Sequence, residues 1–507
     1  MSPRRTSSYA KNASLAGTLF KHFFVFTVGF LSPVLFSSPS TAQVNFNLTS
    51  LTNEAGTDSS DSVVSGDFNN DGILDLVTVN TESVSFYKGL GGGKYAAPIV
   101  QSLPLQTTGG FGPAFAADFN GDGKLDVASA FGPTCYLCTY GPVTILLGNG
   151  DGTFTQGTSI MPGGNANAGS IALADFNGDH KPDIAISDVQ TNQTWIYLGN
   201  GDGTFTLSDT QPNGGDQFVV GDFNGDGKPD LAYYENFGNF GILLGNGDGT
   251  LKPSISARIP AFVTSLAVGD FYNNHIQSIA AVADDYNNSN IYLYSIRLSN
   301  GALSSKQMLI GNFPNAGPSY AAGGDLNGDF KFDVFLAGRS GWGNGSVYSA
   351  YMLGNGDGTF QSAENAPNNA STGFELPIIR DFNLDSRHDV GIAWFSSTPG
   401  GGVVQLLNTN AAQNCAPPKA NRLGVHICAP TSGETVGSTF TFKGAGNAFS
   451  GIAKRMELWI DGHKVGQDLE DQLNVTTTLT LGKHTASFVV VDSFDNYTSR
   501  SVTFTVN

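Results

Sequence analysis

Asp118-Phe-Asn-Gly-Asp-Gly-Lys-Leu-Asp126 and Asp222-Phe-Asn-Gly-Asp-Gly-Lys-Pro-Asp230 are two copies of one short loop that decides the fold of this chain. Each copy lies between two apolar runs. Seven such loops, here called the acidic loops and numbered one to seven, start 47 to 57 residues apart at Asp67, Asp118, Asp175, Asp222, Asp270, Asp325 and Asp381. Self-similarity at this period indicates a radial array of small units, not a single compact core.

Each unit of the repeat is predicted to hold four short antiparallel strands. In the third unit, apolar runs at 171–176, 183–187 and 194–199 precede the Gly-rich turn Asn200-Gly-Asp-Gly-Thr-Phe205, which opens a fourth strand. Similar turns occur at 148–154, 245–251 and 354–360, with weaker versions at 89–95 and 299–303. Four short strands per unit are typical of a propeller blade. The sequence therefore predicts an all-β fold, with a seven-bladed β-propeller in residues 43–410.

The two ends of the repeat region predict how the ring closes. The seventh unit shows three strands, since no Gly-rich turn follows residues 403–408. Residues 44–52 carry Phe46 where a fourth strand would have its phenylalanine. We therefore expect this segment to supply the outer strand of the seventh unit and to remove an open sheet edge. The alternative is a frayed N-terminal segment.

The spacing of oxygen-bearing side chains predicts that the acidic loops bind calcium. Calcium takes six to eight oxygen ligands in flexible geometry, and the loops place Asp, Asn, Asp and Asp at positions 1, 3, 5 and 9. The alternative is a set of metal-free Asx-turns. Extracellular calcium modules bind at roughly 0.1–1 mM, which favours a filled structural site over a calcium switch. The expected ligands in six loops are Asp67, Asn69, Asp71, Asp75, Asp118, Asn120, Asp122, Asp126, Asp175, Asn177, Asp179, Asp183, Asp222, Asn224, Asp226, Asp230, Asp325, Asn327, Asp329, Asp333, Asp381, Asn383, Asp385 and Asp389.

Two departures from the loop pattern bear on calcium binding. Glycine at position 6, as at Gly123, tolerates the positive φ of a sharp turn. His180, Phe330 and Ser386 stand there in loops three, six and seven, which predicts weaker or more strained sites. Loop five is expected to be empty, because its ligands are replaced by Tyr272, Asn274 and Ser278.

The acidic loops and Gly-rich turns resemble the FG-GAP/VCBS repeats of integrin α-subunit propellers and of many secreted bacterial proteins. The resemblance covers about residues 44–410. Integrin propellers carry calcium loops in only some blades, so six complete loops are closer to the bacterial type. The resemblance implies a calcium-bearing propeller, and we see no inserted domain and no membrane-spanning tail like those of integrins.

Composition and charge narrow the range of partners. A chain of 507 residues suggests more than one domain, and 65 glycines with 40% hydrophobic residues fit a turn-rich all-β protein. The net charge is −18 with only 25 Lys and Arg. Phosphate binding needs clustered basic residues, so nucleic acid and anionic membranes are not expected as partners.

Residues 1–42 are predicted to be a signal peptide. Basic residues precede an apolar run at 23–36, and Ser40-Thr41-Ala42 offers small residues before a cut at Gln43. The run is too short to span a bilayer. We expect a secreted or cell-surface protein with no integral membrane segment after cleavage. The alternative is an uncleaved membrane anchor.

The four cysteines fall into two close pairs, Cys135/Cys138 and Cys415/Cys428. Exported proteins commonly form disulfides, and we expect two local ones. The alternatives for the first pair are a redox site or half of a zinc site. Residues 411–420 are predicted to be a linker, and residues 421–507, which alternate as short strands, an immunoglobulin-like β-sandwich. Its default role is that of a spacer or adhesive module.

Propeller connectivity predicts where a ligand binds. The acidic loops and the Gly-rich turns should share one face, and the second turns of the units, which vary in length, should form the other. Variable loops on a rigid scaffold commonly carry recognition, and aromatic and Arg side chains suit a sugar or a protein hot spot. The alternative for each ring is packing between blades. The candidate ligand-binding residues are Tyr136, Tyr140, Tyr234, Phe237, Tyr286, Arg339, Trp342 and Trp394.

Three classes of function remain. The favoured one is a non-catalytic binding or adhesion protein for a glycan or a cell-surface or matrix protein. The others are a secreted enzyme acting on polysaccharide or phosphoester and a structural cell-surface scaffold. We assign no catalytic residues, because most clustered carboxylates belong to the acidic loops. An unassigned pair such as Asp284/Asp285 is the remaining candidate for an acid and a base.

Overall fold

The structure is a computed structural model in which residues 43–507 form one compact unit. The residues that it describes are 44–52, 62–79, 83–103, 113–130, 141–164, 168–188, 191–235, 238–285, 288–313, 317–339, 347–368, 373–395, 402–410, 415, 418, 423–448, 454–469 and 471–507. No helix in this part of the chain is long and apolar enough to cross a membrane.

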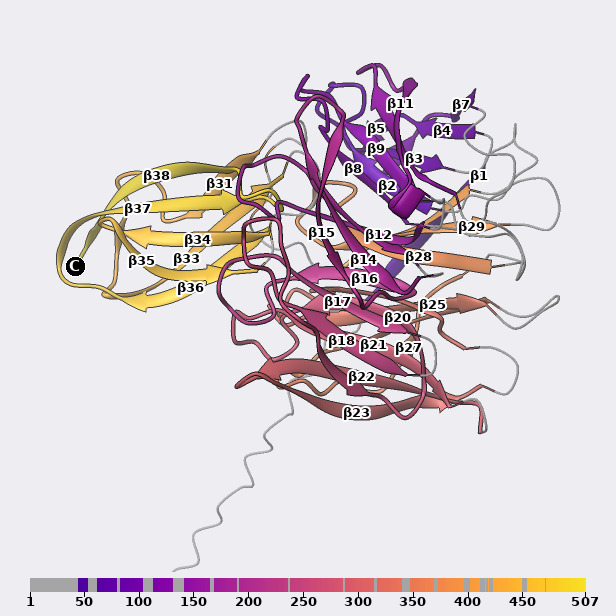
Figure 1. Ribbon diagram of the computed structural model, residues 1–507. Coiled ribbons are helices and arrows are strands. Elements are labelled where there is room, and N and C mark those ends of the chain that lie inside the picture. The colour runs from indigo at the N-terminus through magenta and orange to yellow at the C-terminus, as the bar shows by residue number, and fades with distance from the viewer. Residues whose placement is uncertain are drawn as a thin grey trace, which may run out of the picture. The chain divides into compact units, whose positions relative to one another are not determined.

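Seven four-stranded antiparallel sheets make up the repeat region (Figure 1). Four of them are β2-β3-β4-β7 (Ser62–Gly66, Asp75–Val79, Ser83–Tyr87, Ile99–Ser102), β8-β9-β10-β11 (Ala114–Ala117, Asp126–Ala130, Val143–Gly148, Phe154–Ile160), β12-β13-β14-β15 (Ala168–Ala174, Asp183–Asp188, Gln193–Gly199, Phe205–Gln211) and β16-β17-β18-β19 (Gln217–Gly221, Asp230–Glu235, Asn239–Leu243, Ile255–Arg258). The others are β20-β21-β22-β23 (Phe262–Gly269, Ser278–Asp285, Asn290–Ser299, Ala302–Asn312), β24-β25-β26-β27 (Tyr320–Gly324, Asp333–Arg339, Val347–Met352, Glu364–Asn365) and β28-β29-β30-β1 (Gly373–Arg380, Asp389–Phe395, Gly402–Asn408, Phe46–Thr52).

The first strands of the sheets touch one another in chain order. Strand β2 contacts β8, and the contacts continue through β12, β16, β20 and β24 to β28, which contacts β2 again. This arrangement of repeated four-stranded sheets is that of a repeat β-propeller. A short hairpin of β5 (Gly89–Gly91) and β6 (Lys94–Tyr95) forms the Gly-rich turn of the first unit, and one helical turn, η1 (Pro162–Gly164), is present in the described chain.

The N-terminal strand pairs as predicted. Strand β1 runs antiparallel to β30, and its register places Phe46 opposite Asn408. The Phe46 ring meets the rings of Phe335 and Tyr351 edge-on, at centroid distances of 6.3 and 6.0 Å. The strand therefore completes the last sheet and packs against the sheet before it.

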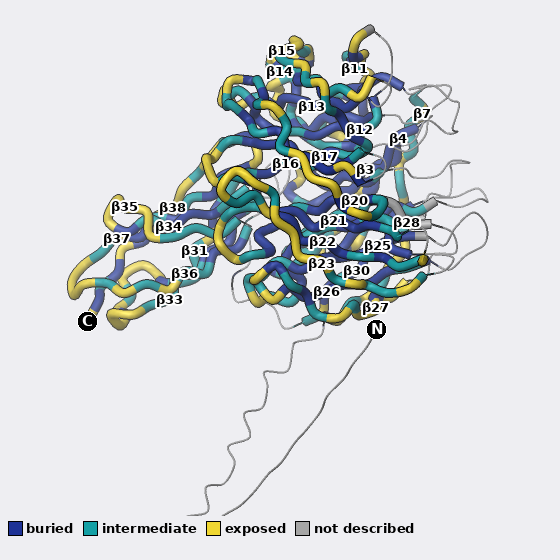
Figure 2. Tube along the Cα trace, turned by 60° about the horizontal axis from the view of Figure 1, so that its bottom comes forward, coloured by how far each residue is buried: buried dark blue, intermediate teal, exposed yellow. Residues whose placement is uncertain are grey.

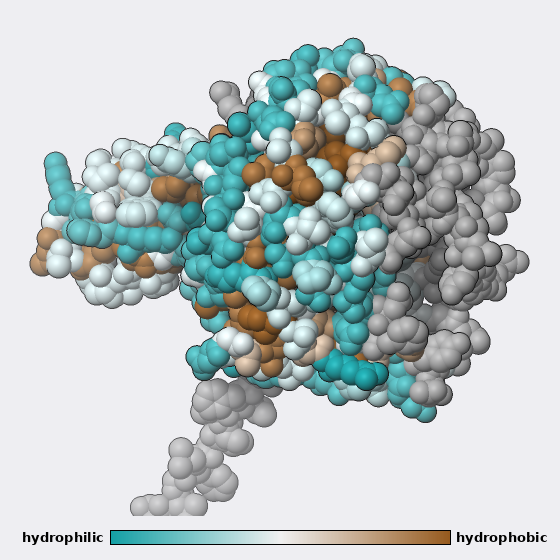
Figure 3. Space-filling view, viewed as in Figure 1, coloured by the Kyte–Doolittle hydropathy of each residue, from teal (hydrophilic) through white to brown (hydrophobic). Residues whose placement is uncertain are grey.

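The core lies between neighbouring sheets. The inner strands are buried along their length and the outermost ones are largely exposed (Figure 2). One cluster joins Ala185 and Ile196 of the third sheet to Phe218, Leu231 and Leu243 of the fourth. An inner strand has a sheet on each side, so its side chains are apolar on both faces, as a continuous apolar run predicts. On the side shown in Figure 3, apolar side chains form small groups between hydrophilic ones.

The C-terminal domain, defined here as residues 423–507, contains two sheets. One is β31-β33-β36 (Gly424–Ala429, Thr439–Asn447, Gln472–Thr478), and the other is β32-β38-β37-β34-β35 (Thr435–Val436, Tyr497–Val506, Gly482–Val491, Arg455–Ile460, His463–Asp468). Phe442 of the first sheet packs against Phe488 and Phe504 of the second. The predicted Cys415–Cys428 disulfide is present, whereas Cys135 and Cys138 lie outside the described residues.

Candidate metal centres and ligand face

The aspartate at position 9 fastens each complete acidic loop to its sheet. In loop two, Asp126 opens β9 and is fully buried. Its Oδ2 accepts a hydrogen bond from the Phe119 amide (2.9 Å) and its Oδ1 one from the Gly148 amide at the start of the Gly-rich turn (2.7 Å). The same pair of bonds is made by Asp75, Asp183, Asp230, Asp333 and Asp389.

The side-chain oxygens of the other candidate ligands accept hydrogen bonds from backbone amides of the same loop. Asp118 Oδ1 accepts the amides of Gly121 and Asp122, at 2.8 and 3.1 Å, and its Oδ2 accepts the Gly123 amide at 2.8 Å. Asn120 Oδ1 accepts the Asp122 amide at 2.9 Å. A carboxylate has about four lone-pair sites, so these bonds leave oxygen capacity for a metal ion. The loop is thus closed around its own oxygen-bearing side chains.

The electrostatics of the acidic loops suit a divalent cation. Burial, together with the neighbouring loop carboxylates, raises the pKa of Asp126 to about 6 and that of Asp75, Asp183 and Asp230 to about 7. The lysines paired with loops one, two, three and six sit at the rim, as in the Lys88–Asp71 pair at 3.1 Å, and exposed pairs contribute little. In loop seven the less exposed Arg387 pairs with Asp385. Buried carboxylates of like charge need a counter-charge. The donor set, all oxygen and mostly carboxylate, is the one that calcium prefers.

Position 6 has positive φ in all seven loops, whatever residue stands there. Glycine fills it in loops one, two and four, with φ between 79° and 84°. His180, His275, Phe330 and Ser386 adopt the same left-handed conformation, with φ between 61° and 70°. A non-glycine residue there costs about 1–2 kcal/mol. The strain that the sequence predicts at His180, Phe330 and Ser386 is therefore present in the backbone.

Loop five keeps the loop shape without the calcium ligands. Ser278 stands at position 9, and its Oγ accepts the Phe271 amide at 3.2 Å, as the aspartate does elsewhere. Tyr272 stands at position 3. The Arg297 guanidinium lies 4.6 Å from the Tyr272 ring centroid, and the Tyr272 hydroxyl is 3.0 Å from Ser295 Oγ. A cation over an aromatic face stabilises by electrostatics, so protein contacts hold this loop.

We expect Tyr272→Ala to lower the free energy of unfolding by about 2 kcal/mol, through loss of the cation–π contact and the hydroxyl hydrogen bonds. The number of bound calcium ions should not change. Denaturant unfolding and metal analysis measure the two effects. Tyr272→Phe, which keeps the ring, should recover about half of the loss. Unchanged stability in Tyr272→Ala would contradict this role.

The Gly-rich turns lie on the same face as the acidic loops, as the connectivity predicts. The Gly203 amide donates to the Phe119 carbonyl of loop two at 2.9 Å, and the Gly249 amide donates to the Phe176 carbonyl of loop three at 2.9 Å. The Phe205 and Phe119 rings meet edge-on at 5.8 Å. Each such turn therefore ties its unit to the acidic loop of the unit before it.

Of the candidate ligand-binding residues, the structure describes the surroundings of two side chains. Tyr234 is 9% exposed in a core cluster, and its hydroxyl donates to the Thr264 carbonyl at 2.9 Å. Trp394 packs against another core cluster. Tyr234 therefore packs between sheets, the alternative considered for each ring, whereas Trp394 is partly buried. The other candidates lie outside the residues whose side chains are described: Tyr136, Tyr140, Phe237, Tyr286, Arg339 and Trp342.

Asp284 and Asp285 are neighbouring carboxylates, and burial together with the charge of Asp285 raises the pKa of Asp284. Both belong to β21, and consecutive strand residues point to opposite faces. Asp285 Oδ2 accepts the Asn288 side-chain amide at 2.8 Å, a local turn contact. A second cluster, Cys415, Cys428 and His426, offers no thiolates for a metal because the two sulfurs are bonded to each other.

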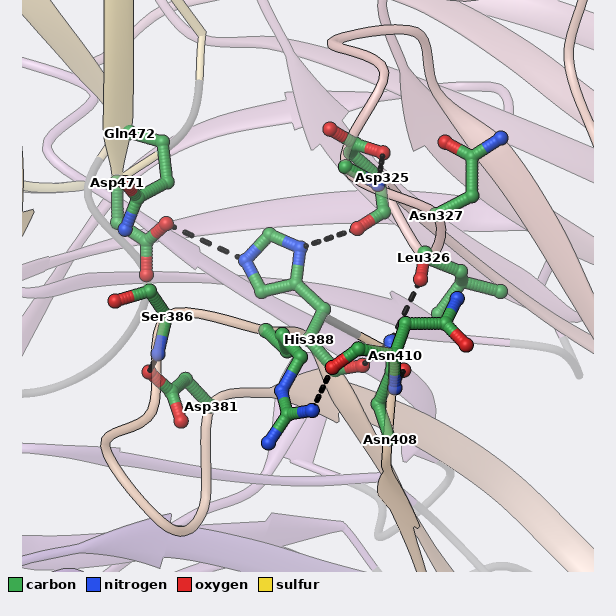
Figure 4. Close-up of a pocket in the computed structure, with 12 residues that line it drawn as sticks. Asp325, Leu326, Asn327, Asp381, Ser386, His388, Asn408, Asn410, Asp471 and Gln472 are labelled. Carbon is green, nitrogen blue, oxygen red and sulfur yellow. Dashed lines mark hydrogen bonds and ion pairs between the residues drawn. The ribbon is translucent and has the colours of Figure 1, made fainter. Parts of the chain in front are cut away.

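Acidic loops six and seven border a small cavity that also receives residues of the C-terminal domain (Figure 4). His388 lies at its centre, with Nδ1 3.1 Å from the Asp325 carbonyl and Nε2 3.3 Å from Asp471 Oδ1. Asp325 and Asp381, the first candidate ligands of the two loops, line the wall. Sequence reasoning missed Asp471, because nothing in its local sequence links it to a loop more than 80 residues away.

Comparisons with known proteins identify the repeat. A family model described as an FG-GAP-like repeat matches four segments, 67–129, 133–186, 185–233 and 222–281. The chain therefore contains FG-GAP-like repeats, which confirms the resemblance over this region. A comparison with curated proteins gave no match.

Similar solved structures include a lectin from Agrocybe aegerita, studied for specific recognition of non-reducing terminal N-acetylglucosamine, with 19% identity over 69% of this chain and 94% of that chain and a TM-score of 0.42. Another is virginiamycin B lyase from Staphylococcus aureus, with 14% identity over 72% of this chain and 100% of that chain and a TM-score of 0.45. At these TM-scores the similarities carry no argument about ligand or reaction.

Proposed function

We propose that this chain is a secreted, calcium-binding, seven-bladed β-propeller with a C-terminal immunoglobulin-like domain, and that it acts as a non-catalytic binding or adhesion protein for a glycan or a cell-surface or matrix protein. The observation that carries the proposal is the acidic loop, repeated in six units with an all-oxygen donor set on the scaffold of an FG-GAP-like repeat. The signal peptide predicted at residues 1–42 supports secretion.

Calcium would act here by stabilising the propeller scaffold. Asp118, Asn120, Asp122 and Asp126 would hold the ion in loop two, and the other five complete loops would do so with the equivalent residues. When bound, the ion supplies the positive charge that lets buried carboxylates stay ionised. In the first six units other than the fifth, the position-9 aspartate also fastens its loop to the following Gly-rich turn, and in the seventh Asp389 accepts the Asn408 amide instead. A filled loop would therefore stiffen one whole face of a unit.

Recognition is proposed on the opposite face. The acidic loops and Gly-rich turns bond to each other on one face, which leaves the second turns of the units as the variable surface. The test is binding of residues 43–507 to a broad glycan and polysaccharide array, in calcium and in chelator. A calcium-dependent, saturable signal is expected. An array without signal would move the proposal to protein partners, to be sought by pull-down from cell surfaces.

We expect Trp342→Ala to weaken binding of an array ligand by about 30-fold, because aromatic anchors are worth about 2 kcal/mol or more at recognition sites. The melting temperature should not change. The matched control is Tyr497→Ala, which removes an aromatic ring that is 73% exposed on the C-terminal domain. Equal affinity of Trp342→Ala and the unmodified chain would remove this residue from the ligand face.

A further inference from the structure

The C-terminal domain touches the propeller at its acidic loops. The His180 Nδ1–H of loop three donates to the Phe494 carbonyl at 3.1 Å. Ser386 Oγ of loop seven donates to the Cys415 carbonyl, next to the domain, at 2.5 Å. The Phe494 side chain is only 5% exposed, because it packs into a propeller core cluster with Phe119 and Ile184. The contact is thus both polar and apolar.

The residues that make these polar contacts are the ones that replace glycine at position 6. At Gly123 and Gly227, where glycine is kept, an added Cβ would meet no atom of the described chain within 4 Å. In loop five, His275 lies close enough to Asp468 that its charge opposes the rise in the pKa of Asp468 that burial causes. The strained backbone at His180 and Ser386 is therefore matched by a contact that glycine cannot make.

Position 6 links the calcium ligands directly to the docked domain. The backbone amide of His180 donates to Asp175 Oδ2 at 2.8 Å, and that of Ser386 donates to Asp381 Oδ2 at 2.7 Å. Asp175 and Asp381 are the first candidate ligands of their loops. In each of these two loops, the main chain of the position-6 residue bonds a candidate calcium ligand and its side chain bonds the C-terminal segment. Ordering of the loop and docking of the domain therefore depend on each other.

The charges at the contact also link calcium binding to docking of the C-terminal domain. Asp471 of the C-terminal domain faces the cavity wall that contains Asp325 and Asp381 (Figure 4). The cavity also holds two basic side chains: His388, whose Nε2 lies 3.3 Å from Asp471 Oδ1, and Arg387, which pairs with Asp385. Without a cation in the loops, the three carboxylates that line the cavity still outnumber these basic groups, and like charges repel. A calcium ion in each loop would remove this repulsion.

We propose that the acidic-loop face is the docking surface for the chain's own C-terminal domain, and that calcium binding in loops three and seven and docking of this domain strengthen each other. The proposal rests on the calcium binding proposed above. Because linkage is reciprocal, loss of docking must lower calcium affinity by the factor by which calcium strengthens docking.

Two variants of residues 43–507 test the link by calcium titration calorimetry and small-angle X-ray scattering. Phe494→Ala removes the apolar contact and changes no loop residue. His180→Gly with Ser386→Gly removes the two polar contacts made by position 6, leaves the His388–Asp471 contact, and restores the glycine of loops one, two and four. Glycine also relieves the strained φ, so without linkage this double variant should bind calcium equally well or more tightly. With linkage, both variants should bind two calcium ions at least about fivefold more weakly.

Small-angle X-ray scattering measures compactness, and therefore whether the C-terminal domain is docked on the propeller. The unmodified chain should expand in chelator, and both variants should be expanded even in calcium. The matched control is Gly227→Ser, which adds a side chain at position 6 where an added Cβ would meet no atom of the described chain within 4 Å; its compactness should not change. Unchanged or tighter calcium binding in Phe494→Ala and the double variant would overturn the linkage while leaving calcium binding intact. Absence of bound calcium in the unmodified chain, by metal analysis, would overturn the proposed function as well.

Discussion

Removal of calcium is expected to lower the melting temperature of residues 43–507 by about 8 °C. A ligand that binds only the folded state stabilises it by mass action, by about 1.4 kcal/mol per site at a free concentration about ten times the dissociation constant. Six sites with dissociation constants of about 1 mM would therefore contribute about 8 kcal/mol in about 10 mM calcium. For a chain of this size the entropy of unfolding is about 1 kcal/mol/K, so about 1 kcal/mol shifts the melting temperature by about 1 °C.

Calorimetric melts in calcium and in chelator measure this effect, and metal analysis counts the ions. The matched pair of variants is Asp126→Asn in loop two and Ser278→Asn in loop five, because both change position 9. Asp126→Asn should lose one calcium ion and part of the calcium-dependent shift, whereas Ser278→Asn should lose neither. A melt that is the same in chelator, with no calcium found, would reject the assignment of the loops.

In chelator, the stability of the same chain should rise as the pH is lowered from about 7.5 to about 5. Burial raises the pKa of Asp75, Asp183 and Asp230 to about 7 and that of Asp126 to about 6, from an ordinary value of 3.8. Between the ordinary and the raised pKa, the folded state binds protons that the unfolded state does not. Stability is therefore present at low pH and is lost as the pH rises through the folded pKa, by at most about 1.4 kcal/mol per pH unit for each group.

Calcium should reverse the sign of this dependence, because carboxylates must be ionised to hold the ion and protons displace it. Melting temperatures at a series of pH values, with calcium and with chelator, give the two slopes. Glu457 does not interfere: burial would raise its pKa, but hydrogen bonds from Arg455, Lys464 and Trp459 together lower it to about 2, so it acts only below about pH 4.5. Slopes of the same sign in both conditions would contradict this account.

The local features of the fold followed from the sequence. The strands, the acidic loops and the Gly-rich turns depend on residues close together in the chain, and the repeat shows each of them several times. Even the long-range pairing of β1 with β30 could be predicted, because Phe46 occupies the place that a phenylalanine has in the other units. The positive φ at His180, Phe330 and Ser386 was likewise predictable from the glycine in the equivalent loops.

Only the tertiary structure shows which segments contact the residues that replace glycine at position 6. His180 meets a residue 314 positions away, and His388 meets Asp471, 83 positions away; no local pattern encodes such a meeting. Tyr234 and Trp394 are apolar enough to sit on a ligand face or in a core, and only the packing of neighbouring sheets buries Tyr234 and partly covers Trp394. The sequence by itself determined the repeat, its strands and its candidate calcium ligands, because these are set by short-range spacing. Only the three-dimensional contacts determined which loops carry the C-terminal domain and which aromatic rings are buried, since burial and docking depend on surfaces that distant segments bring together.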